Sequence, residues 1–584
     1  MPSISSGGNS PRRSTSAATT TSPLMSRYRW LEPAPAPSSA FDLTDFPLLS
    51  VILARRGITS LQQARSFLQP RVHELADPYG LPDLELAAER VRSAIRNRRP
   101  IAVFGDYDVD GLTSTALLTR VLRSLGAEVR PYVPNRLQDG YGLNLAAIDR
   151  IIKDGAALLL TADCGTSNGR ELAMAQRAGL ETVVLDHHHA HGVELPGTAF
   201  VSPRREDCRY PFREMSAVGV CYHLVRALAG EDVAAAMLPL VALGTVADVV
   251  PLVGENRIKV HHGLARFGSD APLGLKELAR QADLDPFGVT SWHCGFILGP
   301  RINAAGRMAD PLTALDLLLT DDPAKASRLA LELGKLNARR QREMERMIAE
   351  AEEKLRHGGR DAGPLLVLAD TAWSIGLVGL VAGRLVERYR RPAIVLERGP
   401  DVSRGSARSI DGFNIAEALG QCHDLLLEHG GHSMAAGLTI ETERLVELEE
   451  RLVGILDATV GDDIPTPTLQ LDAELHSSEL TLETERLVSL LEPTGHGNAA
   501  PRFFARGLAV RRPRVSRDGK HLMFQAVGSD GTAVRAVFFN GAYALPDLVR
   551  LGRVDLAFSL KRDSWKGETR VELDVLDFRP ATEF

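Results

Sequence analysis

Short apolar runs alternate with amphipathic segments between residues 101 and 189. This alternation predicts a mostly parallel β-sheet with helices on both faces. The expected strands are IAVFGD, EVRPYVP, ALLLTAD and ETVVLDHH, and the expected helices between them cover residues 111–124, 145–153 and 170–177. The region before this sheet, residues 46–100, carries apolar residues at spacings of three and four, which predicts a helical cap.

A second α/β unit is expected further along the chain. Asp322 and Pro323 form an N-cap and a first helical position, and apolar residues then recur at helical spacing until Gly358. At 1.5 Å per residue this helix is roughly 50 Å long, enough to bridge two domains. After it come the strand-like runs LLVLAD and PAIVLE, on either side of a helix expected over residues 376–389.

The pattern changes again from about Thr466 onward. Strand-like runs separated by Gly, Asp and Asn turns predict a five-stranded OB-type barrel; they are FFARGLAVRRPRV, HLMFQAVG, AVRAVFF, VDLAFSLKRD and ETRVELDVLDF. The expected fold is therefore two α/β domains joined by a long helix, with a C-terminal OB-type β-barrel. The predicted division is 1–40, a disordered tail; 41–320, the helical cap and first α/β domain; 321–358, the helix; 359–462, the second α/β domain; and 463–584, the barrel.

The first forty residues are rich in Ser, Thr, Pro and Ala and predict a disordered tail. Arg12 and Arg13, among many hydroxyls and almost no acids, are also typical of an organelle transit peptide, although no clear amphipathic helix accompanies them. Both interpretations stay open at this point.

Composition restricts the possible architecture and binding sites but does not indicate a function. A chain of 584 residues with 44% hydrophobic residues needs several cores. Its 68 Lys and Arg against 74 Asp and Glu give a net charge of −6, so any nucleic-acid site must be a local basic groove. The five scattered cysteines, without CxxC spacing, indicate reduced thiols in a cytosolic protein, and we expect no membrane-spanning apolar run.

Acidic residues follow the predicted strands, and they suggest a metal site. Asp106, Asp108 and Asp110 come after the first strand, and Asp163 follows ALLLTAD. Three histidines come after ETVVLD, and Asp248 interrupts an otherwise apolar stretch. Each feature alone also fits an ordinary acidic turn, a helix N-cap, a surface loop or a satisfied core acid.

Together these groups point to divalent cations. Strand carboxyl ends meet at one edge of a parallel sheet, and aspartates that converge there repel one another unless cations lie between them. Carboxylates with imidazole suit two ions of Mn²⁺ or Mg²⁺. Two such ions activate water for attack on phosphorus.

Ordered motifs give a resemblance to a known family. GDYDVDG, TADCGTSN, LDHHHA and ALGTVADVVPL resemble the four motifs of the DHH phosphoesterase family, and GGHSMAAG resembles the glycine-rich motif of the DHHA1 domain. GPRINAAGRM, SARSIDGFNI and TGHGNAAPRFF extend the likeness, which runs from Arg29 to the C-terminus. The whole set of motifs is similar to that of the family's bacterial exonucleases.

The resemblance implies a role for each acidic residue. It implies that Asp108 and Asp163 hold one cation, and that Asp163 bridges to a second cation. The ligands of that second cation would be Asp110, Asp163, His187 and Asp248. Asp106 would be a supporting acid or an additional ligand. His188 would position or protonate the phosphate.

The resemblance also implies a grip on a nucleic-acid strand. The residues implied to contact it are Arg136, Tyr141, Arg301, Asn303, Arg307, Ser406, Arg408 and His432. The alternatives are surface salt bridges for the arginines and a packed ring for the tyrosine. In relatives a histidine often follows the tryptophan at position 373, whereas Ser374 stands here, so any contact made by that histidine is in doubt.

Two basic segments have open interpretations. ARRQRE, residues 338–343, either contacts DNA or is a solvated helix face. In the barrel, Phe503, Phe504 and Phe524 are either core residues or stacking platforms. They lie among basic residues that fit a groove for a nucleic-acid backbone, namely Arg511, Arg512, Arg514, Arg517 and Lys520.

The function implied by the resemblance is a metal-dependent 5′ to 3′ exonuclease that hydrolyses single-stranded DNA to mononucleotides in recombination and repair. One alternative is a family phosphodiesterase for oligoribonucleotides or other small phosphate substrates, which generally lacks the barrel. Another is a non-catalytic nucleic-acid-binding subunit, which would have lost metal ligands. The implied partners are single-stranded DNA, a helicase and a single-strand-binding protein. A monomer in the bacterial cytoplasm, away from membranes, is expected.

Overall fold

The structure is a computed structural model that describes residues 26–34, 46–135, 142–358, 363–461, 466–565 and 568–582. It divides into two compact units. One contains Arg65–Pro465 and Leu491–Ala500, and the other contains Met1–Ala64, Thr466–Leu490 and Pro501–Phe584. The predicted residues Arg136 and Tyr141 lie outside the described residues, as does most of the predicted N-terminal tail.

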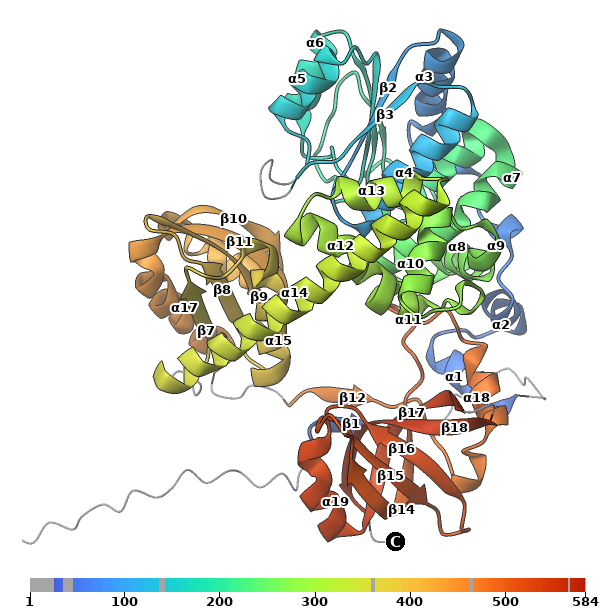
Figure 1. The fold of residues 1–584 in the computed structure, drawn as a ribbon, viewed down its shortest axis with the longest axis vertical. Helices are drawn as coiled ribbons and strands as arrows, with labels where there is room; N and C mark the ends of the chain where they lie inside the picture. Colours follow the sequence, from blue (N-terminus) through green and yellow to red (C-terminus); the bar gives the residue numbers. More distant parts are fainter. Residues whose placement is uncertain are drawn as a thin grey trace, which may run out of the picture. The chain divides into compact units, whose positions relative to one another are not determined.

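The first unit begins with the predicted parallel sheet, in the order β3-β2-β4-β5-β6 (Figure 1). Its strands are β2 (Ile101–Gly105), β3 (Val129–Tyr132), β4 (Leu158–Ala162), β5 (Glu181–Leu185) and β6 (Ala199–Val201). The helices that cover it are α3 (Leu84–Arg96), α4 (Val109–Ser124), α5 (Leu145–Lys153) and α6 (Gly169–Arg177). The sequence pattern predicted every strand except the short β6. The core strand β2 is buried along its whole length, as expected for a strand covered on both faces.

Helix α7 (Ala217–Ala247) doubles back on itself. A straight helix of its 31 residues would separate its ends by about 45 Å. Gly230 instead has φ 82° and ψ 177°, and the two ends reach the same aspartate-rich site. By length and composition alone, α7 is a candidate for a helix that crosses a membrane. The break at Gly230, Pro239 and a buried face packed on α4 are features of a core helix in the domain.

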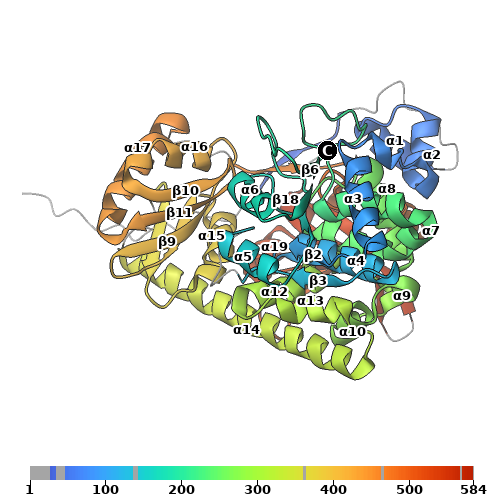
Figure 2. The same ribbon diagram turned by 90° about the horizontal axis from the view of Figure 1, so that it is seen from above.

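More helices complete this domain and lead into the long helix. They are α8 (Gly254–Ala265), α9 (Phe267–Asp270), α10 (Leu273–Gln281), α11 (Ser291–His293), α12 (Gly299–Met308) and α13 (Leu312–Leu319). A π-helical turn, Cys294–Leu298, separates α11 from α12. The predicted long helix is α14 (Pro323–Gly358), which contacts both α12 and α15 (Figure 2).

The second α/β region is a mixed sheet in the order β10-β11-β9-β8-β7. Only β7 and β8 pair in parallel, and the others are antiparallel. The strands are β7 (Leu366–Asp370), β8 (Ala393–Glu397), β9 (Val402–Arg408), β10 (Leu426–His432) and β11 (Ala435–Glu441). The helices of this region are α15 (Ile375–Tyr389), α16 (Ile415–Gly420) and α17 (Leu445–Thr459).

The other unit contains the predicted barrel. Five strands close on themselves because β14 pairs with both β15 and β17, and β13 (Ala473–Glu474) joins as an extra strand. The barrel strands are β14 (Phe503–Val515), β15 (Leu522–Val527), β16 (Ala533–Phe538), β17 (Arg553–Trp565) and β18 (Glu568–Pro580). Three helices belong to this unit, α1 (Pro47–Arg55), α18 (Leu482–Ser489) and α19 (Leu545–Leu551), and α2 (Leu61–Leu68) crosses into the first unit.

One prediction about this unit needs correction, and one open alternative is resolved. Residues Arg29–Leu31, expected in the disordered tail, form β1 and pair in parallel with β12 (Thr468–Gln470). The Trp30 ring packs edge-on against Phe504, and its indole nitrogen donates to Asp577, so this short segment has a core to join. The barrel phenylalanines are buried core residues rather than stacking platforms.

The division into units also differs from the predicted boundaries. The described residues up to Ala64 group with the barrel rather than with the first α/β domain, and Leu491–Ala500 returns to the first unit. All five cysteines are buried and free, which agrees with the prediction of reduced thiols.

Candidate metal centre

Three aspartates follow three adjacent strands of the parallel sheet. Gly105 pairs with Ala162, and Ala162 pairs with Leu185, so the carboxyl ends of β2, β4 and β5 are level. The residues that come next are Asp106, Asp163 and Asp186, and all three are buried. The register of the sheet therefore gathers these carboxylates at one edge.

The turn after β2 is held by its own side chains. Asp108 is the N-cap of α4 and accepts a hydrogen bond from the backbone N–H of Gly111 at 3.0 Å. A Cβ atom at Gly111 would lie 2.5 Å from the backbone oxygen of Asp106, so glycine is required for this close approach. The GDYDVDG motif thus folds so that its three aspartates surround one short turn.

Asp110 belongs to the first turn of α4, and its carboxylate contacts the N-terminus of α7. Its two carboxylate oxygens accept hydrogen bonds from the backbone N–H groups of Ala217 at 2.7 Å and Val218 at 2.9 Å. The first N–H groups of a helix have no partner within the helix and favour an anion. This contact fixes the orientation of the Asp110 carboxylate, and each oxygen keeps a further lone pair for another ligand.

Asp163 adopts a left-handed backbone conformation, with φ 64°. Such conformations are uncommon for residues other than glycine, and strained residues gather at functional sites. Its Oδ1 atom lies 3.3 Å from Nε2 of His187. The strained turn aims the carboxylate toward the neighbouring strand end.

Asp186 is absent from the predicted site residues, yet it organises the loop after β5. Its Oδ2 accepts from the N–H and hydroxyl of Thr166, and its Oδ1 accepts from the N–H of His187 and from Nδ1 of His188 at 2.7 Å. Burial raises its pKa, but the hydrogen bond and charge of His188 outweigh burial, so the net pKa is below the usual range. Its position one residue after an apolar strand was the available signal.

His187 connects the acidic residues. Its Nε2 lies 4.0 Å from Asp110 Oδ2, and its Nδ1 lies 3.7 Å from Asp248 Oδ2. Among the described residues, three overlapping groups each place one ligand atom per residue within 4.8 Å of the others. The groups are Asp106, Asp108 and Asp163; Asp110, His187 and Asp248; and Asp163, His187 and His188.

The electrostatics of these groups fit divalent cations. Burial and then the charge of Asp108 raise the pKa of Asp110 to about 7, and burial and then Asp110 raise that of Asp248 to about 9. Burial followed by neighbouring carboxylates also raises the pKa of Asp163 well above its usual range. In the described part of the chain, Asp248 Oδ2 is buried without a hydrogen-bond partner. Cations between these groups would offset the repulsion and satisfy that oxygen.

The two histidines of this loop differ in protonation. Burial and then the charge of His188 lower the pKa of His187 to about 4, so its neutral imidazole can act as a metal ligand. Burial also acts to lower the pKa of His188, but its hydrogen bond to Asp186 outweighs this and raises it. His188 is therefore suited to donate a hydrogen bond to an anion rather than to bind a cation.

Three of the predicted strand-binding residues lie on β9 and β10, the two strands that flank β11. Arg408 on β9 and His432 on β10 both pair with Ala435 on β11, so they occupy one row of the sheet. Arg408 Nη1 donates to the hydroxyl of Ser406 at 2.8 Å. The His432 ring lies 5.9 Å, centroid to centroid, from His189 in the loop after β5. The second α/β region thus brings this row beside the metal-site loop.

The predicted residues of α12 lie on the other side of the turn after β2. A Cβ atom at Gly306 would lie 3.2 Å from the backbone oxygen of Tyr107, so α12 contacts that turn directly. Arg307 donates from Nη1 to the backbone oxygen of Gly376 at 3.2 Å, which ties α12 to α15. Arg301 donates to the backbone oxygen of Ile297, and Asn303 lies on the same helix.

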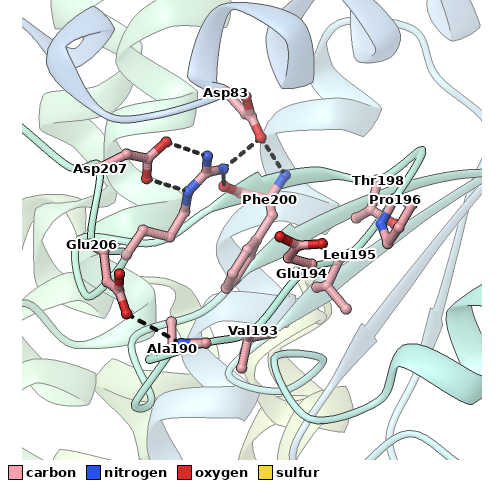
Figure 3. Close-up of a pocket in the computed structure, with 12 residues that line it drawn as sticks. Asp83, Ala190, Val193, Glu194, Leu195, Pro196, Thr198, Phe200, Glu206 and Asp207 are labelled. Atoms are coloured by element: carbon pink, nitrogen blue, oxygen red, sulfur yellow. Dashed lines mark hydrogen bonds and ion pairs between the residues drawn. The ribbon is translucent and has the colours of Figure 1, made fainter.

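A separate cavity of about 440 Å³ lies beside β6 (Figure 3). Its one arginine, Arg205, forms ion pairs with Asp83 at 2.6 Å and Asp207 at 2.7 Å. It also donates to the backbone oxygen of Phe200. The guanidinium is therefore neutralised within the protein and offers little to a phosphate.

Three family models match parts of the chain. Residues 100–245 match the DHH family, N-terminal domain, residues 362–459 match the DHHA1 domain, and residues 471–577 match the RecJ OB domain. The three matched regions follow one another along the chain.

Whole-chain similarity is also high. The single-stranded-DNA-specific exonuclease RecJ of Bacillus subtilis (strain 168) is 35% identical over 563 residues, which cover 95% of this chain and 71% of that protein. The protein of the same name from Escherichia coli (strain K12) is 34% identical over 561 residues, 91% of this chain and 96% of that one.

Solved structures agree with this. The crystal structure of RecJ in complex with Mn²⁺ from Thermus thermophilus superimposes with a TM-score of 0.80 at 32% identity, and covers 96% of this chain and 80% of that one. The Mg²⁺ complex from the same organism gives a TM-score of 0.75 at 30% identity and covers 95% of this chain and 79% of that one.

Proposed function

The chain belongs to the RecJ family of DHH phosphoesterases, and from this we propose that it is a divalent-metal-dependent exonuclease that degrades single-stranded DNA from the 5′ end. The observation that carries the proposal is the acidic cluster at the carboxyl ends of β2, β4 and β5, linked through His187. The RecJ OB domain favours this activity over the small-substrate alternative, whose enzymes generally lack a barrel.

We assign the ligands as follows. Asp108 and Asp163, with Asp106 beside them, would hold one cation, and Asp110, His187 and Asp248 would hold the other, with Asp163 shared. When bound, Mn²⁺ or Mg²⁺ supplies positive charge at the scissile phosphate and lowers the pKa of a coordinated water. The α7 N-terminus keeps the Asp110 carboxylate in place for this purpose.

The remaining residues position the strand. Asp186 holds Nδ1 of His188, which leaves Nε2 as the nitrogen that can donate to a phosphate oxygen. Arg408 and His432 in one row of the sheet, with Ser406 two residues before Arg408 on β9, offer donors for the phosphate backbone. Arg301, Asn303 and Arg307 of α12 would contact the strand from the other side.

We further propose that the chain acts as a monomer in the bacterial cytoplasm. Because its substrate is a single strand, we propose two partners: a helicase that separates duplex DNA and a single-strand-binding protein that covers the separated strand.

Digestion of 5′-labelled and 3′-labelled DNA, single-stranded and duplex, with Mn²⁺ or Mg²⁺ tests the function. We expect early release of a labelled mononucleotide from 5′-labelled single strands only, and none after chelation. Release from 3′-labelled strands first would overturn the polarity. Hydrolysis of dinucleotides alone would favour the small-substrate enzyme, and binding without hydrolysis would favour a non-catalytic subunit.

A further inference from the structure

Arg340 on α14 has no ion-pair partner in the part of the chain that the structure describes. Its Nε atom is buried and, within the described residues, has no hydrogen-bond partner. Burial and then the positive charges of Arg301 and Arg384 lower its pKa, and no carboxylate contributes to that pKa. A half-buried cation near two other cations costs stability unless an anion joins them.

The two neighbouring arginines come from different helices. Arg301 belongs to α12, and its guanidinium donates to the backbone oxygen of Ile297 at 2.9 Å. Burial lowers its pKa, and Asp283 is the acid whose charge opposes this. Arg384 on α15 is exposed and pairs with Glu387 of its own helix at 2.8 Å. Helix α14 contacts both of the other helices (Figures 1 and 2).

A second polar group on α14 is also unsatisfied. Asn337 is three residues before Arg340, so the two side chains share one face of the helix. Its side chain is buried, and its Oδ1 has no hydrogen-bond partner among the described residues. Among the described residues, this face therefore carries two buried polar atoms without hydrogen-bond partners, and of these only the Arg340 donor can bind an anion.

Arg205 and Arg257 are arginines with a structural role, and their partners can be compared with those of Arg340. Arg205 is paired with the carboxylates of Asp83 and Asp207. Arg257 is nearly fully buried and donates to four backbone oxygens. Arg340 has neither kind of support, so its partner is expected from outside the chain.

We propose that Arg340, with Arg301 and Arg384, forms a further anion site that holds a backbone phosphate of the bound single strand. This inference rests on the proposed function and extends it. The guanidinium groups offer paired N–H donors that match phosphate oxygens. In this proposal Arg340 is the one arginine of the ARRQRE segment that binds DNA, and its exposed neighbours form a solvated helix face.

The position of α15 explains why the anion is a strand phosphate rather than a free ion. A Cβ atom at Gly379 would lie 3.1 Å from both Arg408 Nη2 and Ser406 Oγ, so α15 lies directly beside the proposed clamp. Arg384 follows five residues later, about 7.5 Å along the helix axis. Arg384 therefore lies within about two turns of the clamp on the same helix, which also contacts α14.

The test compares Arg340→Gln with Arg339→Gln in the full chain. Arg339 is exposed and adjacent, so its replacement removes the same charge outside the site. Binding of fluorescent (dT)12 in EDTA is measured by anisotropy over a range of salt concentrations. We expect Arg340→Gln to weaken binding about tenfold and to reduce the salt slope by about 0.7, the value for one phosphate contact to a single strand. Arg339→Gln should match the wild type, and Arg340→Lys should lie between.

Thermal melting without DNA separates this from a structural role. Removal of an uncompensated charge should leave the melting temperature of Arg340→Gln unchanged or raise it. A fall shared by Arg340→Lys, or (dT)12 binding by Arg340→Gln equal to that of Arg339→Gln, would overturn the assignment. Stabilisation by inorganic phosphate that depends on Arg340, with unchanged (dT)12 binding, would also overturn it in favour of a free-anion site. If the wild type does not bind (dT)12 at all, the proposed function is wrong. This result differs from failure of the Arg340 assignment, in which the wild type binds and Arg340→Gln binds equally well.

Discussion

At the level of single residues, Asp163 combines strain with crowded charge. Its φ of 64° suits Asp, Asn or Gly but not Ala, and its carboxylate is buried next to other acids. Replacement by asparagine therefore changes the charge while it keeps the backbone conformation. Replacement by alanine would mix a backbone effect into any result.

We expect Asp163→Asn to abolish hydrolysis, by at least about a thousandfold, while (dT)12 binding in EDTA remains within a few-fold of wild type. The reason is that Asp163 belongs to the first acidic group and also approaches His187, so its loss disrupts both proposed cation sites. Melting curves give a second measurement. Without metal, Asp163→Asn should melt higher than wild type because repulsion is relieved, and it should gain less from added Mn²⁺.

Asp149→Asn serves as a control for this substitution, because Asp149 is half exposed on α5 and pairs with Lys153. It should behave as wild type in all three measurements. Substantial turnover by Asp163→Asn in saturating Mn²⁺ would remove Asp163 from the shared position.

A buried cluster away from the metal centre predicts the pH dependence of stability. His223 contacts Glu255 at 3.1 Å and Lys259 at 2.8 Å. Burial and then Lys259 lower the pKa of His223 from 6.5 to about 3. The charge of Lys259 lowers the pKa of Glu255 below 4.5 despite burial. Both pKa values are lower in the folded state than in the unfolded state. The contribution of this cluster to the free energy of unfolding is therefore fully present above pH 6.5 and is lost as the pH falls.

Urea unfolding at pH 7.0, 5.5 and 4.5 checks this. The His223 contribution should decline below pH 6.5 with a slope that approaches about 1.4 kcal/mol per pH unit, and Glu255 adds to the loss below pH 4.5. Burial lowers the pKa of Lys259 to about 8, so its effect falls on the alkaline side. His223→Gln should be less stable at pH 7.0 but show a shallower decline between pH 6.5 and 4.5. Parallel curves for variant and wild type would refute the assignment, since other titrating groups cancel in the difference.

At the level of elements, local patterns were enough to predict the strands of the parallel sheet other than β6, but not β9, β10 and β11 of the second sheet or the connections between helices. The strands of the parallel sheet are continuous apolar runs that end in aspartate, and α5 has the predicted bounds. The apolar stretch that ends at Asp248 showed no period that separates a helix from a buried strand. Its role depends on Gly230, where α7 turns back so that Ala217 and Asp248 both meet Asp110. That meeting is a long-range contact which no local pattern specifies.

The row formed by β9, β11 and β10 gives a prediction at this level. Arg408→Ala should weaken (dT)12 binding about tenfold and flatten its salt dependence by about 0.7, because one phosphate contact releases fewer counterions. Anisotropy titrations from low to moderate salt provide the measurement. Arg451→Ala, which removes an exposed arginine that pairs with Asp424 in the same region, should leave the slope unchanged. If both variants show the wild-type slope, the row does not bind the backbone.

At the level of the whole molecule, the two units are not contiguous in sequence. Residues 491–500 include most of the TGHGNAAPRFF motif and come directly before the barrel strand β14 in the sequence, yet they belong to the first unit. Arg257 holds this segment through the backbone oxygens of Leu491, Glu492 and Pro493. Backbone oxygens are available from any residue type, so this contact has no signature in the sequence. The short strand β1 escaped prediction for the same reason, since it is defined by its pairing with β12.

This arrangement predicts that truncation at the apparent domain boundary removes part of the catalytic unit. A chain of residues 65–465 lacks the segment that Arg257 binds, whereas residues 65–500 retain it. The backbone oxygen of His496 in this segment also accepts a hydrogen bond from the N–H of Leu252, four residues after the proposed ligand Asp248. At about 1 kcal/mol net per hydrogen bond, the shorter chain should lose about 3 kcal/mol or more of stability. Differential scanning fluorimetry should show a melting temperature several degrees lower, and half-maximal stabilisation should require more Mn²⁺.

Arg257→Ala, made in both the longer and the shorter chain, gives a double-mutant cycle with the truncation. In residues 65–500 this substitution should lower the melting temperature substantially, because three of its four backbone partners belong to the retained segment. In residues 65–465 those partners are already gone, so the same substitution should cost much less. Equal costs in the two chains would mean that Arg257 stabilises the first unit through Phe67 alone, over whose ring its guanidinium lies at 3.8 Å. The barrel would then be separable at residue 465 without loss to the metal centre.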